Sequence, residues 1–134
     1  MSEENKQPEA GRPVRQIVAD LSKPIADRHL ESRKQGGTVL HYISWHNAVR
    51  YLDLYAPGWC SEITKIHTDD KRIYLVARIS IPCAEGLVYR EATGTEELNT
   101  NSFGDPSSNA ESMALRRAAA KWGLGLYLYD KGNK

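Results

Sequence analysis

Residues 111–125, ESMALRRAAAKWGLG, decide the fold, because they form one helical pattern with a narrow packing face. Ala114, Ala118 and Trp122 recur at intervals of four, and Leu115 and Ala119 extend the same arc of a helical wheel. Small side chains on this arc allow a helix to lie close against a sheet. The stretch therefore predicts a long helix near the C-terminus that covers a sheet.

Local signals predict where this helix begins and ends. Ser108 followed by Glu111 matches a capping box at the N-terminal end. Gly123 stands where a left-handed glycine commonly closes a helix. We expect the helix to run from about residue 108 to residue 122.

The segment before the helix changes to a period of two and predicts three strands, at residues 59–67, 72–81 and 87–95. Asp69-Asp70 and Glu85-Gly86 separate these runs and are typical of tight turns. The strands therefore predict an antiparallel meander. Alternation places isoleucine, leucine and alanine on one face of the middle strand and arginines on the other, so one face is core and the other cationic.

Upstream of the strands, helical spacing predicts helices at residues 14–21, from 25 to about 34, and at 45–55, with Ser44 as the N-cap of the third. Gly36 and Gly37 end the second helix, and residues 38–43 form a short strand. The fold class is thus α+β: a three-stranded antiparallel meander packed by a long C-terminal helix, with N-terminal helices.

The length of 134 residues predicts one domain, here residues 13–131, behind a polar, disordered leader at 1–12. The leader resembles neither a secretory signal nor a transit peptide, and no apolar run approaches the roughly 20 residues of a membrane span. Cys60 and Cys83 lack CxxC spacing, so we expect reduced thiols. These features predict a cytoplasmic protein.

Motifs for catalysis and cofactor binding are missing from the sequence. Gly123-Leu124-Gly125 follows a helix, so it cannot cradle phosphates as a P-loop does. The histidines show no metal-binding spacing. Four carboxylates near strand ends could hold Mg²⁺ in a small nuclease, but side chains in turns are usually solvated: Glu62, Asp69, Asp70 and Glu91. We expect no enzyme activity, no catalytic residue, no metal and no cofactor.

The basic residues raise the possibility of a nucleic-acid partner, although the formal net charge is only +1. Taken alone, the cations on the C-terminal helix are equally well explained as a solvated face that favours the helix dipole. Together with cations elsewhere they could line a groove that follows a phosphate backbone. The candidates are Arg33, Lys34, Arg72, Arg78, Arg90, Arg116, Arg117 and Lys121. Tyr42, Tyr74 and Tyr89 are candidates for stacking on bases or for the core.

Several of these motifs occur in the order of a known family. The run ESRKQGGTVLHYISWHNAVRYLDLYAPGWCSEI, the three strands, REATGTEE and ESMALRRAAAKWGLGLYLYDK resemble the Rad52/22 family of single-strand annealing proteins, particularly short bacterial and phage members, including DdrA-like proteins. The resemblance covers residues 25–131. It implies a β-β-β-α core, assembly into a homo-oligomeric ring, and ATP-independent annealing of complementary strands in recombinational DNA repair.

The resemblance also implies which residues bind single-stranded DNA. The family's inner groove uses an arginine before the glycine run, which matches Arg33, and a basic pair that matches Arg116 and Arg117. Many relatives carry a further arginine where this chain has Ala120, so Lys121 is a candidate substitute. A single-stranded DNA-binding protein and a nucleoid-associated location are further expectations.

Two alternatives remain from the residues themselves. A double-stranded RNA-binding module also orders strands before an alanine-rich basic helix. A small metal-dependent nuclease is the enzymatic alternative.

Overall fold

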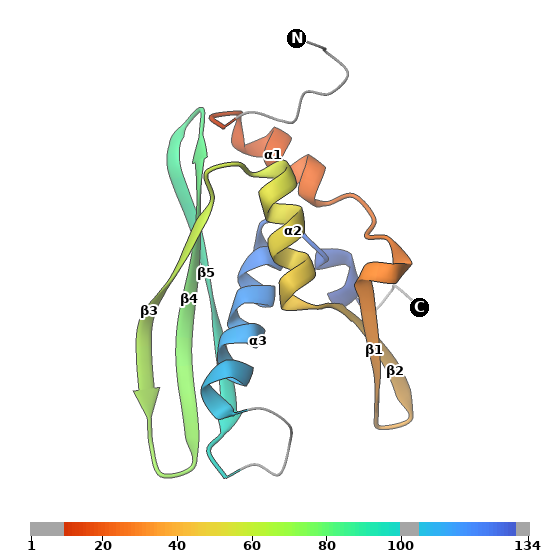
Figure 1. The fold of residues 1–134 in the computed structure, drawn as a ribbon, viewed down its shortest axis with the longest axis vertical. Coiled ribbons are helices and arrows are strands. Elements are labelled where there is room, and N and C mark those ends of the chain that lie inside the picture. Colours follow the sequence, from red (N-terminus) through yellow and green to blue (C-terminus); the bar gives the residue numbers. More distant parts are fainter. Residues whose placement is uncertain (1–9, 100–104, 131–134) are drawn as a thin grey trace.

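The computed structural model describes residues 10–99 and 105–130, which form a mixed α+β fold (Figure 1). The helices are α1 (Val14–Leu21), α2 (Trp45–Tyr55), α3 (Pro106–Lys121) and the short 3₁₀ turns η2 (Asp27–His29) and η3 (Leu126–Tyr129). The strands are β1 (Leu30–Gln35), β2 (Thr38–Ile43), β3 (Cys60–Thr68), β4 (Arg72–Cys83) and β5 (Gly86–Glu97). The predicted helix at 14–21 and the predicted helix at 45–55 are therefore confirmed.

The predicted meander is also confirmed. β3, β4 and β5 form an antiparallel sheet in that order, and β1 and β2 pair with each other in a separate two-stranded sheet. β4 is the central strand, and a bulge between Ile63 and Lys65 interrupts its pairing with β3. The bulge adds one residue to β3 and locally changes the register.

The core lies between the sheet and α3. One face of β4 is buried, as the alternation predicts, and α3 packs mainly on β4 and β5. Trp122 is 0% exposed, and its Nε1 donates to the Ile79 carbonyl oxygen at 3.2 Å. The helix lies close to the strands because its buried face consists of alanines: Ala110, Ala114, Ala118, Ala119 and Ala120.

One glycine on β5 is required by this packing. A Cβ on Gly94 would overlap the Ala110 carbonyl oxygen and would lie 2.7 Å from the Ala114 amide nitrogen. Both atoms belong to the helix backbone and cannot rotate away as a side chain can. Gly94 therefore sets how closely α3 approaches the sheet.

β3 is less covered than the other two strands of the sheet. All nine of its residues are exposed, and it forms the edge of the sheet next to β4. Ile63 and Ile66 point to the helix side of the sheet, opposite Ala77 and Leu75, but remain 38% and 63% exposed. The helix therefore leaves an apolar strip uncovered on β3.

The predicted helix from 25 to about 34 is wrong. The segment forms η2 and then β1, which pairs with β2 through the two-residue turn Gly36-Gly37. Both glycines have positive φ, +59° and +81°, a combination required by the tight turn that suits a two-residue hairpin. The Gly-Gly pair between two alternating segments was the available signal for a hairpin.

The predicted capping box at Ser108 is also wrong. α3 begins at Pro106, and Asp105 is the N-cap, because its Oδ1 accepts from the Ser108 amide at 2.8 Å. Aspartate is a strong N-cap, and proline suits the first helical position because it lacks the amide that would otherwise be unpaired. Ser108 is the third residue of the helix. The predicted glycine at the other end is confirmed, since Gly123 has φ +109°.

The chain before α1 is anchored to the end of β4. The Gly11 amide donates to the Pro82 carbonyl at 3.2 Å, and Arg12 forms an ion pair with Asp20 at 2.7 Å. The predicted disordered leader at 1–12 otherwise falls on residues 1–9, which lie outside the described residues. Among residues 10–99 and 105–130, none of the helices combines the length and the apolar character that a membrane span requires.

We predict that Gly94→Ala destabilises the protein by at least about 3 kcal/mol, the upper end of the range for overpacked cores, because the new methyl group meets backbone. Gly36→Ala is the matched control. No atom lies within 4 Å of its Cβ, so only the positive φ opposes it, at about 1 kcal/mol. Urea unfolding would measure both values, and equal losses would contradict the packing argument.

A second prediction concerns pH. Hydrogen bonds from the Ser108 amide and then from the Ser107 hydroxyl lower the pKa of Asp105 below 3.8. A carboxyl whose pKa falls on folding stabilises the native state above its unfolded pKa, and this stabilisation disappears as the pH falls through its folded pKa. Asp105→Asn keeps a capping oxygen but not the charge. Its urea midpoint should be lower than that of the native protein at neutral pH and should approach it below pH 3.8.

The control for this prediction is Asp105→Ala, which removes the cap at every pH. Its midpoint should therefore remain lower than that of Asp105→Asn throughout the titration. A difference between the native protein and Asp105→Asn that stays constant from pH 7 to pH 3 would rule out the proposed role of the Asp105 charge.

Candidate nucleic-acid interface

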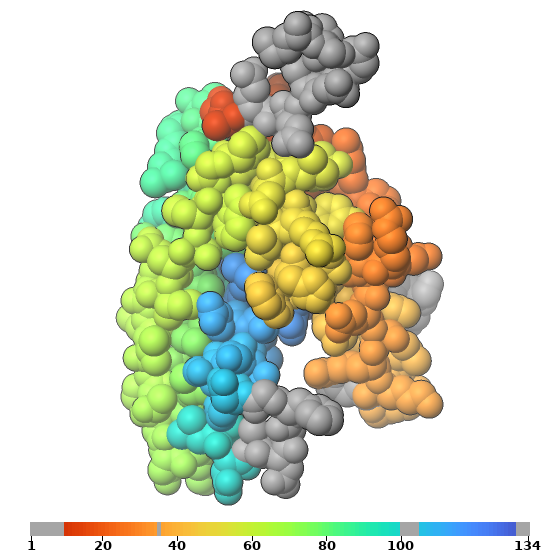
Figure 2. Space-filling view, in the orientation of Figure 1, coloured from red at the N-terminus to blue at the C-terminus, as the bar shows by residue number. Residues whose placement is uncertain are grey.

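The β1–β2 hairpin projects from the body of the protein and stands beside α3 (Figure 1). The space-filling view shows an opening between the hairpin and the helix (Figure 2). We call this opening the hairpin cleft and define it by Arg33 on β1, Tyr42 on β2 and Arg116 on α3. Most residues of the hairpin are exposed, so its side chains are available to a ligand.

Strand register places Arg33 on the cleft side of the hairpin. Glu31 pairs with Tyr42 across the hairpin, and Arg33, two residues after Glu31, shares their face. The Arg116 guanidinium carbon lies 5.2 Å from the centroid of the Tyr42 ring, which brings α3 to the same face. The structure therefore places two of the predicted site residues, Arg33 and Arg116, around Tyr42.

The ionisation of Tyr42 reflects this arrangement. Burial, and then the hydrogen bond from its hydroxyl to the Glu31 carboxylate at 3.0 Å, raise the pKa of Tyr42 above its usual value. Arg116 and Arg33 act in the opposite direction, because a positive charge favours the phenolate. Both guanidinium groups are thus close enough to influence one phenol. Within residues 10–99 and 105–130, neither arginine forms an ion pair with a carboxylate.

Helical spacing adds two hydroxyls to the cleft side of α3. Ser112 and Ser108 precede Arg116 by four and eight residues, so the three side chains share one face of the helix. Serine hydroxyls and arginine are both common ligands of phosphate oxygens. Neither serine was predicted as a site residue, although the four-residue spacing of Ser108, Ser112 and Arg116 was the signal that could have identified them.

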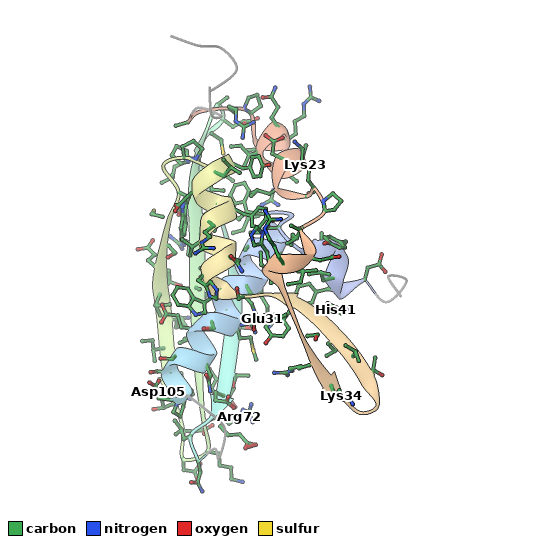
Figure 3. All side chains as sticks on the ribbon, turned by 45° about the vertical axis from the view of Figure 1, so that its right-hand side comes forward. Lys23, Glu31, Lys34, His41, Arg72 and Asp105 are labelled. Carbon is green, nitrogen blue, oxygen red and sulfur yellow. The ribbon has the colours of Figure 1, made fainter. Side chains whose placement is uncertain are left out.

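Lys34 lies on the opposite face of the hairpin from Arg33. It pairs with Val39 and follows Arg33 directly, so its side chain points away from Tyr42. Figure 3 shows Lys34 near the tip of the hairpin and Arg72 on the distant three-stranded sheet. Lys34 therefore contributes positive charge to the hairpin but does not line the cleft.

Two other predicted site residues bind the edge of the sheet. Arg117 Nη1 donates to the Thr93 carbonyl at 2.9 Å, and Lys121 Nζ donates to the Glu91 carbonyl at 2.7 Å. Carbonyls two residues apart on a strand point to the same side, and here they point away from β4. Arg117 and Lys121 therefore bind the outer edge of β5, and consecutive helix positions turn Arg117 away from the direction of Arg116.

Arg90 lies on the helix side of the sheet. Its guanidinium carbon is 4.7 Å from the centroid of the Trp122 ring, and its Nη1 donates to the Lys121 carbonyl. This carbonyl is among the last of α3, which a cation stabilises through the helix dipole. Arg90 therefore caps the C-terminal end of α3 by binding the carbonyl oxygen of Lys121.

The remaining two arginines lie on the outer face of the sheet with carboxylates. Arg78 pairs with Glu91 at 2.9 Å and with Glu62 at 3.8 Å, and it stacks on Tyr89 at 3.9 Å. Arg72 pairs with Glu97 at 3.7 Å. The hydrogen bond that Arg78 Nε donates to the Glu91 carboxylate is the main reason why the pKa of Arg78 is raised. The structure therefore separates both residues from the hairpin cleft.

Comparison with known proteins identifies the family. The sequence model of the Rad52/22 family of double-strand break repair proteins matches residues 13–134. The chain belongs to the Rad52/22 family. This membership confirms the resemblance seen in the sequence and implies a role in DNA repair and recombination.

Two relatives of this Rad52/22 protein come from Arabidopsis thaliana. The chain is 34% identical over 132 residues to "DNA repair RAD52-like protein 1, mitochondrial", with 96% of this chain and 75% of the relative aligned. It is 38% identical over 124 residues to "DNA repair RAD52-like protein 2, chloroplastic", with 90% of this chain and 62% of the relative aligned. Both names state DNA repair. The chain spans less than two thirds of the second relative.

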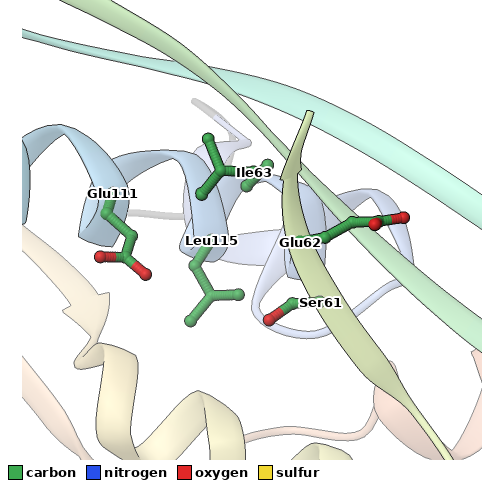
Figure 4. Close-up of a pocket in the computed structure, with 6 residues that line it drawn as sticks. Ser61, Glu62, Ile63, Glu111 and Leu115 are labelled. Carbon is green, nitrogen blue, oxygen red and sulfur yellow. The ribbon is translucent and has the colours of Figure 1, made fainter. Parts of the chain in front are cut away.

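A second hollow in this Rad52/22 protein has a different character. It lies between β3 and α3 and is lined by Ser61, Glu62, Ile63, Ala77, Glu111 and Leu115 (Figure 4). The Glu111 carboxylate faces this hollow, whereas the Glu62 carboxylate is directed to Arg78 on the outer face of the sheet. No cation lines the hollow, so its charge disfavours a phosphate backbone. Among the described residues, no group of three or more histidine, cysteine, aspartate or glutamate side chains could hold a metal ion.

Proposed function

We propose that the hairpin cleft binds single-stranded DNA through its phosphates and that the protein promotes annealing of complementary strands without ATP. The observation that carries this proposal is that Arg33 and Arg116 face the same cleft with no carboxylate partner among the described residues. Unpaired guanidinium groups are available to phosphate oxygens. Family membership independently supports a DNA ligand.

Binding through phosphates suits annealing. Contacts to the backbone carry no sequence information, so the protein accepts any strand. The base edges remain free, and a second strand is then tested by pairing alone. No covalent bond forms or breaks in this process, so no catalytic residue is required.

The other predicted site residues are less available to a phosphate than the arginines of the hairpin cleft. Arg117, Lys121 and Arg90 donate to backbone carbonyls, and Arg72 and Arg78 pair with carboxylates. A phosphate at any of these positions would replace an existing partner. Arg33 and Arg116 lose no such partner, and Lys34 stands next to them on the exposed hairpin. We therefore assign the primary DNA contact to Arg33 and Arg116.

We also propose that copies of the chain assemble into a ring that extends the cleft along one strand. The exposed edge of β3 supports assembly, because an unpaired strand can add to another protein surface. Ile63 and Ile66 provide apolar area beside that edge. A ring would join several weak cleft sites into one strong site. A single-stranded DNA-binding protein remains a predicted partner.

The test compares three variants that each lose one arginine. Arg33→Ala and Arg116→Ala should weaken binding of a 5′-fluorescein-labelled dT oligonucleotide by about tenfold each at low salt. Each should also make the dependence of log K on log salt shallower by about 0.7, the value for one lost phosphate contact to a single strand. Arg15→Ala is the control, because Arg15 is exposed on α1 at the other end of the molecule.

Fluorescence polarisation at several salt concentrations would measure these changes, and annealing of complementary oligonucleotides in EDTA without ATP would test activity. Annealing no faster than the spontaneous reaction would contradict the proposal. Equal losses in Arg15→Ala and Arg116→Ala would show that overall charge matters instead of the cleft. Preference for duplex RNA with elution at 15.0 kDa would favour the RNA-binding module, and cleavage that depends on Mg²⁺ would favour a nuclease.

A further inference from the structure

Trp45 differs from the other two tryptophans in its exposure. It is the first residue of α2 and leaves 51% of its surface exposed. Trp122 is 0% exposed, and Trp59 is partly buried with its Nε1 bonded to Asp53 at 2.7 Å. Tryptophan is highly buried on average in proteins, so a half-exposed indole at the start of a helix calls for a physical explanation.

Helical spacing shows which way Trp45 faces. Ala48 and Leu52 follow it by three and seven residues, share its helix face, and are fully buried in the core. α2 packs against α3. Side chains on a helix lean towards its N-terminus, so the indole extends beyond the packed part of this face towards the junction with β2. Trp45 therefore lies on the side of α2 that faces the core and α3, one turn beyond the buried contact.

The same junction leads to the hairpin cleft. Trp45 follows Tyr42 by three residues, so their Cα atoms are at most about 11 Å apart. The Tyr42 ring lies against the Arg116 guanidinium. A stacked strand advances about 3.4 Å per nucleotide, so this distance corresponds to about three nucleotides. One strand held by Arg33 and Arg116 can therefore also reach the indole.

The indole is held in place by its neighbours. The rings of Trp45 and His46 meet edge to face with centroids 5.8 Å apart. His46 Nε2 lies 3.3 Å from the hydroxyl of Ser44, which also accepts from Asn47 Nδ2 at 3.0 Å. Ser44 and Asn47 are both buried, so this support is fixed to the body of the protein. An aromatic ring positioned before binding loses little conformational freedom when a ligand arrives.

We propose that Trp45 stacks on one base of the single strand held in the hairpin cleft. This inference rests on the proposed function and adds a contact to the base, where the arginines contact phosphates. Stacking uses the flat face of a base and tolerates every sequence. It leaves the pairing edge free, so it is compatible with annealing. The proposal explains why the Trp45 side chain is exposed, because an indole must be accessible to stack on a base.

Tryptophan fluorescence combined with polarisation tests this proposal. Titration with fluorescein-free dT oligonucleotide should quench the emission of the native protein and of Trp59→Phe, because both keep Trp45. Trp45→Phe should lose the quenching while it still binds, since phenylalanine also stacks. Trp45→Ala should weaken binding of labelled dT oligonucleotide by about tenfold, within the range for one lost stacked base.

An oligonucleotide of the same length with abasic sites supplies the control for phosphate binding. The native protein and Trp45→Ala should bind it equally, whereas Arg116→Ala should bind it more weakly. Thermal melting should be the same for the native protein and Trp45→Ala, because the indole is exposed. If the native protein binds dT but its emission does not change and Trp45→Ala binds as tightly, the inference is wrong. If the native protein binds no oligonucleotide, the proposed function fails and this inference fails with it.

Discussion

The close approach of α3 to β5 is the constraint on which the rest of the structure depends. Gly94 offers no side chain, and the Ala110 and Ala114 backbone fills the space where one would lie. At this separation the long side chains Arg117 and Lys121 reach the outer carbonyls of β5. A helix held further away would leave those carbonyls to solvent.

The position of α3 also divides the cations into two groups. The side of the helix next to the sheet directs Arg117 and Lys121 to β5, while the side next to the hairpin presents Arg116 to Tyr42. Consecutive residues on a helix differ by about 100° in direction, so Arg116 and Arg117 have different surroundings. The first lies over an aromatic ring, and the second is bonded to a strand. Two adjacent arginines in one motif therefore have different opportunities to bind a ligand.

Sequence patterns predicted the elements in which a regular hydrophobic repeat continues over many residues. The meander and the helix face of Ala114, Ala118 and Trp122 follow from alternation and from four-residue spacing, and the structure confirms both. The hairpin was missed because β1 is short and polar, so its residues were assigned to the end of a helix. The Gly36-Gly37 pair, which forms the turn of the hairpin, was taken only as the stop of that helix. Missing the hairpin affected the site as well as the element boundaries, because Arg33 lies on β1, and this strand faces α3.

The partners of the cations could not be predicted from spacing. Alternation correctly placed Arg78 on the outer face of the sheet, but its two carboxylates come from β3 and β5, and only the register brings them together. Arg116 and Tyr42 are 74 positions apart in the chain and meet because the hairpin bends towards α3. Such pairings are tertiary, and no local pattern encodes them.

Most of the candidate DNA-binding cations are engaged within the fold, since Arg72, Arg78, Arg90, Arg117 and Lys121 all bind groups of the protein itself. With two or three free cations at the cleft, one chain would displace few counterions on binding a strand, and the salt dependence expected for a single strand is about −0.7 for each phosphate neutralised. The affinity of one cleft for a long strand would therefore be low. The proposed ring would raise it, because each further cleft would bind the same strand at high effective concentration. A stacked indole in each copy would add a contribution that salt does not screen, so binding would persist at ionic strengths where two arginines alone release the strand.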